Sequence, residues 1–382
     1  MSQTPSPDWN PVDPSVLQDQ RHAYDEMRTR CPVAYSDFLN WSLFRHKDVV
    51  SVVEDPQTYS SASRHLAIPN GMDPPQHTRY RHALEPFFTD DMMETFEPRC
   101  RAVATALVRD LLAQGETDAV TEFAEPFTLK SLCLFLGWPI QQWERLLGWT
   151  HGNQQAAFLR DRVIARALAR IFTAFVHEEL EHHREAGATA PHDVTSSLMA
   201  TTVDGKQLTD EQIVSVVRNW TAGHGTVAAG LGILILHLAK HQDIQQRLRA
   251  SPSLIAAAVD EILRVDGPLV ANHRTTTRDV EIDGRHISQG QRISLMWIAA
   301  DRDPHAFDDP DRVRLDRDES GNLLFGQGIH DCMGASLARL EMRVALEELL
   351  ARTRKIELSG TEPPSRGTFP SNGLLVLPLR IS

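Results

Sequence analysis

The chain has few cysteines, and none of them are arranged as a disulfide framework or a zinc site would require. Its 382 residues include only Cys31, Cys100, Cys133 and Cys332, with no Cys-x-x-Cys pair among them. Buried small apolar residues are the simplest interpretation of the first three. Cys332 differs from the other three because it lies in a glycine-rich segment.

Long apolar runs and an export signal are also missing. The amino terminus, MSQTPSPDWNP, is polar and rich in proline, and it lacks the basic start and apolar run of a signal peptide. The apolar stretch Leu231–Ala239 is well short of the roughly 20 residues that cross a bilayer. We therefore expect a cytoplasmic protein with no membrane partner.

An excess of positive charge is absent as well. The formal net charge of −12 argues against nucleic acid as the main partner. There is no internal repeat, and the connector over residues 185–193 is short enough to lie within one domain. With 41% hydrophobic residues, the chain can build a large core. We expect a single domain over residues 1–382, with residues 1–15 as a loose leader.

Helical periodicity dominates the sequence, and the segments that suggest strands are short. This pattern favours a mainly α fold with small β-sheets over an alternating βαβ array. We expect helices near 76–88, 91–114, 160–184, 210–240, 253–265 and 334–353, and strands at 33–35, 41–45, 280–282, 292–297 and 374–379.

The segment 210–240 is the best-defined helix. Thr209 and Gln212 have the spacing of a capping box. The segment is apolar through Leu231–Ile235, which predicts a helix in the middle of the protein. It nevertheless contains four glycines, at 223, 225, 230 and 232, and each costs about 1 kcal/mol relative to alanine. We infer that a bulky group or a neighbouring helix packs against its backbone.

Residues 325–334 read FGQGIHDCMG and precede an amphipathic helix. Gly326 and Gly328 permit a tight turn. Cys332 then lies just before a helix start, where free backbone N–H groups and the helix dipole stabilise a thiolate. Such a thiolate can ligate iron.

This stretch resembles the haem-binding loop of the cytochromes P450, F-G-x-G-x-H-x-C-x-G. Phe325, Gly326, Gly328, His330, Cys332 and Gly334 all match, and the following LARLE is similar to the start of the family's next helix. The resemblance implies a P450-like fold in which haem b lies buried between the long central helix and the cysteine-bearing helix, with Cys332 as the iron ligand.

Further motifs extend the resemblance along the chain. Glu261 and Arg264 match the family's E-x-x-R pair, a buried structural brace that the segment up to Arg317 would complete. Other positions match the residues that hold the two haem propionates, and arginine suits carboxylates through its paired N–H groups. These expected propionate ligands are His77, Arg81, Arg274 and His330.

The long helix reads TAGHGT at 221–226 and resembles the family's A-G-x-(D/E)-T motif, which supplies protons to iron-bound oxygen. Ala222, Gly223 and Thr226 match, and Gly225 stands where the acid is expected. Thr226 retains the hydroxyl. Water beside Gly225 is our hypothesis for the proton supply. His224 is the alternative relay, although one helical step turns it about 100° away and packing is its simpler role.

The resemblance also indicates which segments would line the substrate site. Apolar walls with a few polar groups are typical of such sites. The expected lining residues are Leu66, Ile68, Asn219, Trp220, Val270, Asn272 and Phe369.

We therefore expect a haem-thiolate monooxygenase that inserts one oxygen atom from O2 into a small apolar or aromatic molecule, by hydroxylation or O-dealkylation. A separate ferredoxin and its reductase would supply electrons; Asp331 is unfavourable for an acidic donor, and Arg339 and Arg343 would offset it. Two alternatives stay open. One is a peroxygenase driven by hydrogen peroxide, and the other is a haem-binding sensor without catalysis.

Overall fold

A computed structural model describes residues 5–187, 193–360, 363–367, 369 and 371–382. Its contacts divide into two compact units, and neither is a contiguous stretch of chain. Unit 1 comprises Met1–Ala62, Ala257–Cys332 and Gly367–Gly373. Unit 2 comprises Ser63–Ala256, Met333–Arg366 and Leu374–Ser382. The expected connector at 185–193 falls largely outside the described residues.

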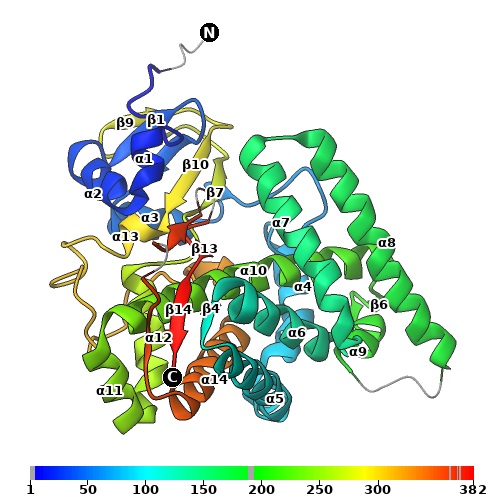
Figure 1. Ribbon diagram of the computed structural model, residues 1–382. Coiled ribbons are helices and arrows are strands. Elements are labelled where there is room, and N and C mark those ends of the chain that lie inside the picture. Colours follow the sequence, from blue (N-terminus) through cyan, green and yellow to red (C-terminus); the bar gives the residue numbers. More distant parts are fainter. Residues whose placement is uncertain (1–4, 188–192, 361–362, 368, 370) are drawn as a thin grey trace. The chain divides into compact units, whose positions relative to one another are not determined.

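Unit 1 is built on a five-stranded sheet with the strand order β1-β2-β10-β7-β3 (Figure 1). Strands β10 and β2 pair in parallel, and the other neighbours are antiparallel. The unit's strands are β1 (Val33–Ser36), β2 (Asn40–Leu43), β3 (Tyr59–Ser60), β7 (Ala271–Thr276), β10 (Arg292–Met296) and the hairpin of β8 (Val280–Ile282) with β9 (Arg285–Ile287). Its helices are α1 (Pro14–Gln18), α2 (Gln20–Arg30), α3 (His46–Val53), α12 (Ile255–Val265, from residue 257 on), α13 (Trp297–Ala300) and the 3-10 turn η6 (Gly328–His330).

The amino-terminal segment is not loose throughout. The backbone N–H of Asp8 donates to the carbonyl of Tyr35, and the Asp8 carboxylate accepts from the N–H of Tyr35. The Trp9 ring is buried against Tyr24 and Phe44. The expectation of a loose leader over residues 1–15 is therefore wrong for residues 8 and 9, because an aromatic side chain in the leader completes the core of unit 1.

Unit 2 is mainly helical, with small accessory sheets. The first of these sheets has the order β11-β14-β4, and the others are the two-stranded pairs β12-β13 and β5-β6. Its strands are β4 (Glu116–Asp118), β5 (Thr202–Val203), β6 (Lys206–Gln207), β11 (Ile356–Leu358), β12 (Ser365–Arg366), β13 (Leu374–Val376) and β14 (Pro378–Ile381). Its α-helices are α4 (Gln76–Leu84), α5 (Asp90–Gln114), α6 (Glu125–Leu136), α7 (Trp143–Leu159), α8 (Arg162–Ala186), α9 (Val194–Ala200), α10 (Asp210–Lys240), α11 (Gln242–Ala250) and α14 (Ala335–Arg352). The predicted mainly α fold with small sheets is confirmed.

Helix α10 is the central helix of unit 2 and contacts α6, α7, α8, α11 and α14 (Figure 1). The predicted capping box is present, with Thr209 accepting from the N–H of Gln212 and the Gln212 side chain accepting from the N–H of Thr209. By length and composition alone this helix could cross a membrane. However, 61% of its most apolar window is buried inside the protein, which is typical of a core helix.

Candidate functional site

The loop before Cys332 has the tight geometry that its sequence predicts. Gly326 and Gly328 have φ values of 72° and 77°, in the left-handed region that favours glycine. At Gly328 a side chain is also excluded by contact, because a Cβ there would lie 2.4 Å from the carbonyl oxygen of Val53. The backbone N–H of Cys332 donates to the carbonyl of Phe325 at 2.7 Å, which closes the loop.

This loop ends at Cys332. Cys332 is exposed, whereas Cys100 and Cys133 are buried. Burial raises the pKa of the Cys133 thiol to about 12, and it also raises the pKa of Cys100, so both stay protonated. Cys31 is half-buried, and burial raises the pKa of its thiol too. Along the chain, Gly334 is the N-cap of α14, so Cys332 precedes a helix start as predicted.

The middle of α10 carries an open stripe of small residues. Ala222 and Gly223 are exposed and Thr226 is half-buried, at three- and four-residue spacing on one helical face. A Cβ built at Gly223 would meet nothing within 4 Å. The next residue, His224, is buried on another side of the helix. A flat group such as haem can lie against a stripe of small residues. A cysteine thiolate is one of the side chains that can ligate haem iron.

The four expected propionate ligands lie in two places in the fold. In unit 2, His77 and Arg81 lie on one face of α4, where His77 is buried and the side chain of Arg81 is 15% exposed. Arg81 also donates to Glu85 at 3.1 Å. In unit 1, Arg274 lies on β7 and donates to the carbonyl of His273, and His330 lies in η6.

Gly225 does not face open space. A Cβ built there would lie 2.9 Å from Cγ2 of Thr150 on α7. Thr150 is buried, and its hydroxyl donates to the carbonyl of Leu146, so its methyl group is held against the glycine. The side-chain direction at Gly225 is therefore occupied by protein. The glycine allows α7 to approach α10 closely.

His224 has both ring nitrogens engaged. Nδ1 donates to the carbonyl of Trp220 at 2.8 Å, and Nε2 lies 3.2 Å from Oε1 of Glu341 on α14. Burial by itself lowers the pKa of His224, but the charge and hydrogen bond of Glu341 and the carbonyl of Trp220 outweigh it, so the pKa is raised. The sequence reasoning missed Glu341, although it lies in the LARLE stretch that marked the start of this helix.

Most residues expected to line a substrate site have other partners. Ile68 is fully buried; its N–H donates to Ser215, and its carbonyl accepts from Asn219 at 2.6 Å. Trp220 packs in an aromatic cluster with Phe87, Phe88 and Phe135. Leu66 is the exposed residue of this group in unit 2, at 41%. Ile68 is therefore buried here, and its role in lining a site stays a prediction.

Of the expected lining residues in unit 1, two are buried and one is exposed. Val270 is fully buried, and Phe369 is 8% exposed and packs edge-on against Phe38. Both belong to the core cluster that contains Trp9. Asn272 is exposed, and its Oδ1 accepts from Nε1 of Trp297 at 2.8 Å. Val270 and Phe369 therefore pack in the core of unit 1, and their role in lining a site stays a prediction.

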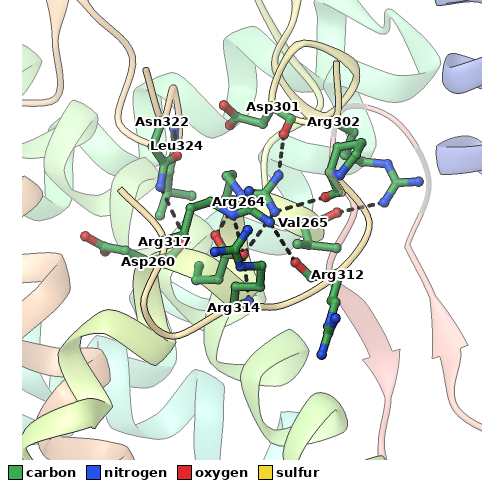
Figure 2. Close-up of polar contacts among 12 residues, drawn as sticks. Asp260, Arg264, Val265, Asp301, Arg302, Arg312, Arg314, Arg317, Asn322 and Leu324 are labelled. Carbon is green, nitrogen blue, oxygen red and sulfur yellow. Dashed lines mark hydrogen bonds and ion pairs between the residues drawn. The ribbon is translucent and has the colours of Figure 1, made fainter. Parts of the chain in front are cut away.

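The brace predicted around Glu261 is fully formed in unit 1 (Figure 2). Arg264 donates to both carboxylate oxygens of Glu261, at 2.7 and 3.1 Å, and Arg317 donates to Oε1 at 2.8 Å. Arg264 also donates to the carbonyls of Asp301 and Pro310. Burial raises the pKa of Glu261, but these donors outweigh it and hold the pKa below its usual value. The predicted buried pair of Glu261 and Arg264 is present, and its contribution to stability stays a prediction.

The basic residues considered for donor docking are less available than the sequence suggests. Arg343 pairs with Glu97 at 2.5 Å and with Glu347 at 3.0 Å. Its charge is therefore balanced within unit 2. Arg339 and Asp331 are exposed. Among the described residues, no group of three or more His, Cys, Asp or Glu side chains is placed to hold a metal ion.

Comparison with known proteins identifies the family. The sequence profile of the family described as "Cytochrome P450" matches residues 147–251 and 253–382. The chain is 32% identical over 352 residues to the cyclomarin C epoxidase CymV of Salinispora arenicola, covering 88% of this chain and 89% of that protein. It is 34% identical to the vitamin D(3) 25-hydroxylase of Pseudonocardia autotrophica, covering 90% and 88%.

A solved structure agrees with these relatives. A mutant of P450 EryK in complex with erythromycin B superposes with a TM-score of 0.86 at 29% identity, covering 95% of this chain and 96% of that one. The profile match and the curated relatives each extend over most of the chain. The chain therefore belongs to the cytochrome P450 family and is a haem-carrying monooxygenase.

Proposed function

We propose that this monooxygenase inserts one oxygen atom from O2 into a small apolar or aromatic molecule, with Cys332 as the ligand of the haem iron. The observation that carries the proposal is the closed loop over residues 325–332, which presents an exposed cysteine just before a helix start. The relatives named above are an epoxidase and a hydroxylase. These names support oxygen insertion as the reaction and do not narrow the substrate.

Bound haem b supplies the activation of dioxygen, and the side chains have separate tasks. The Cys332 thiolate would bind the iron. His77, Arg81, Arg274 and His330 would hold the propionates through charge-assisted hydrogen bonds. The backbone of Phe325, Gly326 and Gly334 would leave room for the ring near the cysteine. On the other helix, Ala222 and Gly223 form a smooth surface, and the Thr226 hydroxyl beside them can hold a proton by hydrogen bonding.

Residue 225 is a glycine and has no side chain that could carry a proton. A Cβ at Gly225 would lie 2.9 Å from the methyl group of Thr150, so a carboxylate at that position would require Thr150 to move. The nitrogens of His224 are engaged with Trp220 and Glu341. Thr226 is thus the side chain of this motif that we assign to proton transfer, and we propose that water on the open face of α10 delivers protons to it.

The remaining partners follow from the class of enzyme. We propose that a separate ferredoxin and ferredoxin reductase supply the electrons, and that the protein acts in the cytoplasm. Of the expected substrate residues, Leu66 and Asn272 keep an exposed surface, and Asn219 and Trp220 keep part of theirs. We retain these four as contacts for the substrate.

The iron ligand can be tested without a known substrate. The reduced holoenzyme is exposed to carbon monoxide and its difference spectrum is compared with that of Cys332→Ser, with Cys133→Ser as the matched control. We expect the thiolate-type spectrum in the wild type and in Cys133→Ser, and its loss in Cys332→Ser. A thiolate-type spectrum in Cys332→Ser would contradict the assignment.

The reaction is then tested by a spectral-shift screen of small aromatics, terpenes and fatty acids, followed by turnover. Each compound that shifts the spin state is incubated with NADH, ferredoxin and reductase, or with hydrogen peroxide alone. Product with the electron donors supports the proposal. Product with peroxide only would establish a peroxygenase, and spectral shifts without product in either case would indicate a sensor.

A further inference from the structure

The core of unit 2 contains a buried polar pair that the proposed mechanism does not use. The side chain of His224 on α10 is 7% exposed, and that of Glu341 on α14 is fully buried. They meet at 3.2 Å across the contact between the two helices. Removing two such groups from water costs several kcal/mol, so their retention in a core needs a reason beyond packing.

The hydrogen bonds fix where the proton of this pair must lie. A carbonyl oxygen only accepts, so Nδ1 of His224 carries the proton that it donates to Trp220. The contact of Nε2 with Glu341 then needs one proton between them, whether the pair is imidazolium with carboxylate or imidazole with carboxylic acid. In both cases the ring is tied at two points, to its own helix and to α14, which prevents it from rotating.

Glu341 depends heavily on this single contact. Among the residues that the structure describes, its other oxygen, Oε2, is buried without a hydrogen-bond partner. Cys100 on α5 lies near enough to sense the charge of Glu341, and the Cys100 thiol bonds to Ser131 rather than to the carboxylate. Losing His224 would therefore leave a wholly unpartnered carboxyl group in the core.

The pair lies in a part of α10 that is rich in small residues. Gly223 and Gly225 flank His224 and have no side chains with which to pack against neighbouring helices. On the α7 side, a Cβ at Gly225 would lie 2.9 Å from the methyl group of Thr150. On the α14 side, the pair joins the two helices. The segment 222–226 therefore has an apolar neighbour on one side and a polar tie on another.

We propose that His224 and Glu341 are positioning residues, which set the rotation of α10 at residues 222–226 and so aim the stripe of Ala222, Gly223 and Thr226. This inference rests on the proposed function, because the stripe matters only if it faces haem. Helix α14, which carries Glu341, is the helix that follows Cys332 in the chain. A change at Glu341 would reach the stripe through His224.

The test uses imidazole as a probe that binds haem iron, and amide hydrogen exchange as a probe that needs no haem chemistry. The variants are Glu341→Ala and Glu341→Gln, where glutamine keeps a hydrogen bond to His224. The matched control is Glu348→Ala on the same helix, which loses contacts with Arg101 and Thr105 instead. All are studied as holoenzymes.

We expect Glu341→Ala to change the imidazole Kd about fivefold and to accelerate exchange at residues 222–226. Glu341→Gln should restore both to near wild type, and Glu348→Ala should change neither, although it lowers the Tm. If Glu341→Ala does not fold, the double variant His224→Phe, Glu341→Leu fills both positions with apolar groups and should reproduce the Kd change.

Equal Kd values for wild type and Glu341→Ala, or equal changes in Glu341→Ala and Glu348→Ala, would overturn the positioning role. The proposed function fails separately, through the carbon monoxide spectrum of the wild type. In that case the exchange rates still report whether the pair holds the segment, so the two failures are distinguishable.

Discussion

Two buried carboxylates in this chain differ in how completely they are satisfied. Glu261 in unit 1 accepts from Arg264, from Arg317 and from the backbone N–H of Arg314. Glu341 in unit 2 has His224 on one oxygen and, among the described residues, nothing on the other. A saturated carboxylate is a fixed part of the fold. An under-satisfied one is sensitive to its single partner, which suits a positioning role.

The largest expected effect comes from breaking the saturated site. Arg264→Ala removes one donor to each oxygen of Glu261 and the donors to two backbone carbonyls, while Arg317 and Arg314 still donate to Oε1. Because it leaves a buried charge with incomplete compensation, we expect a loss of about 3–5 kcal/mol in the free energy of unfolding. Denaturant unfolding followed by circular dichroism measures it. A loss below that of His224→Ala would reverse the comparison.

Neutralising each carboxylate sharpens the contrast. Glu261→Gln places an amide N–H against arginine donors and should cost about 2–3 kcal/mol, because hydrogen bonds to charged groups are the stronger ones. Glu341→Gln keeps one hydrogen bond to His224 and should cost about 1 kcal/mol. Both values come from parallel chemical denaturation. Equal costs would show that the second carboxylate is as firmly fixed as the first.

A smaller effect on stability is expected at Gly225, and its sign should depend on the methyl group of Thr150. Gly225→Ala gains about 1 kcal/mol in helix propensity but pushes its Cβ into Thr150, for a net loss of about 1 kcal/mol. Thr150→Ser removes the methyl group and keeps the hydroxyl that donates to Leu146. In that background the same alanine should be stabilising. Thermal unfolding of the four proteins tests this, and a destabilising alanine in both backgrounds would refute the contact.

The last prediction concerns pH, beside the brace. Burial raises the pKa of Asp301 from 3.8 to about 8, although the N–H of Leu323 and the charge of Arg264 act against it. A raised acid pKa favours folding when the group is protonated, so this stability is fully present below the unfolded value near 3.8 and is lost as pH rises through about 8. Asp301→Asn should flatten that decline in a plot of unfolding free energy against pH. An unchanged slope would show that Asp301 titrates normally.

The glycines of α10 show how far sequence reasoning extended. Four glycines in one helix predicted a close neighbour, and at Gly225 that neighbour is Thr150, a residue of α7 that carries no signal in the sequence. At Gly223 the helix has open space instead. Glycine thus allows close helix packing at residue 225 and leaves an open face at residue 223. Hydrophobic periodicity cannot distinguish these two environments, because it does not specify which residue of another helix lies opposite each glycine.

The expected pocket residues show a related limit. Ile68, Val270 and Phe369 are apolar, as a binding site requires, but apolar residues also make the core, and here all three are buried. Asn219 lies on α10, and its amide donates to the carbonyl of Ile68. Position along a family's sequence locates a segment, whereas the direction of each side chain depends on local packing.

The sequence by itself determined the helical fold, the capping box of α10, the cysteine loop and the brace, because each depends on residues close together in the chain or on a motif with fixed spacing. Only the tertiary structure decided that Thr150 closes the side of Gly225, that His224 meets Glu341, and that Arg343 is already paired. Those contacts join helices far apart in the sequence, and long-range packing has no periodic signature from which it can be read.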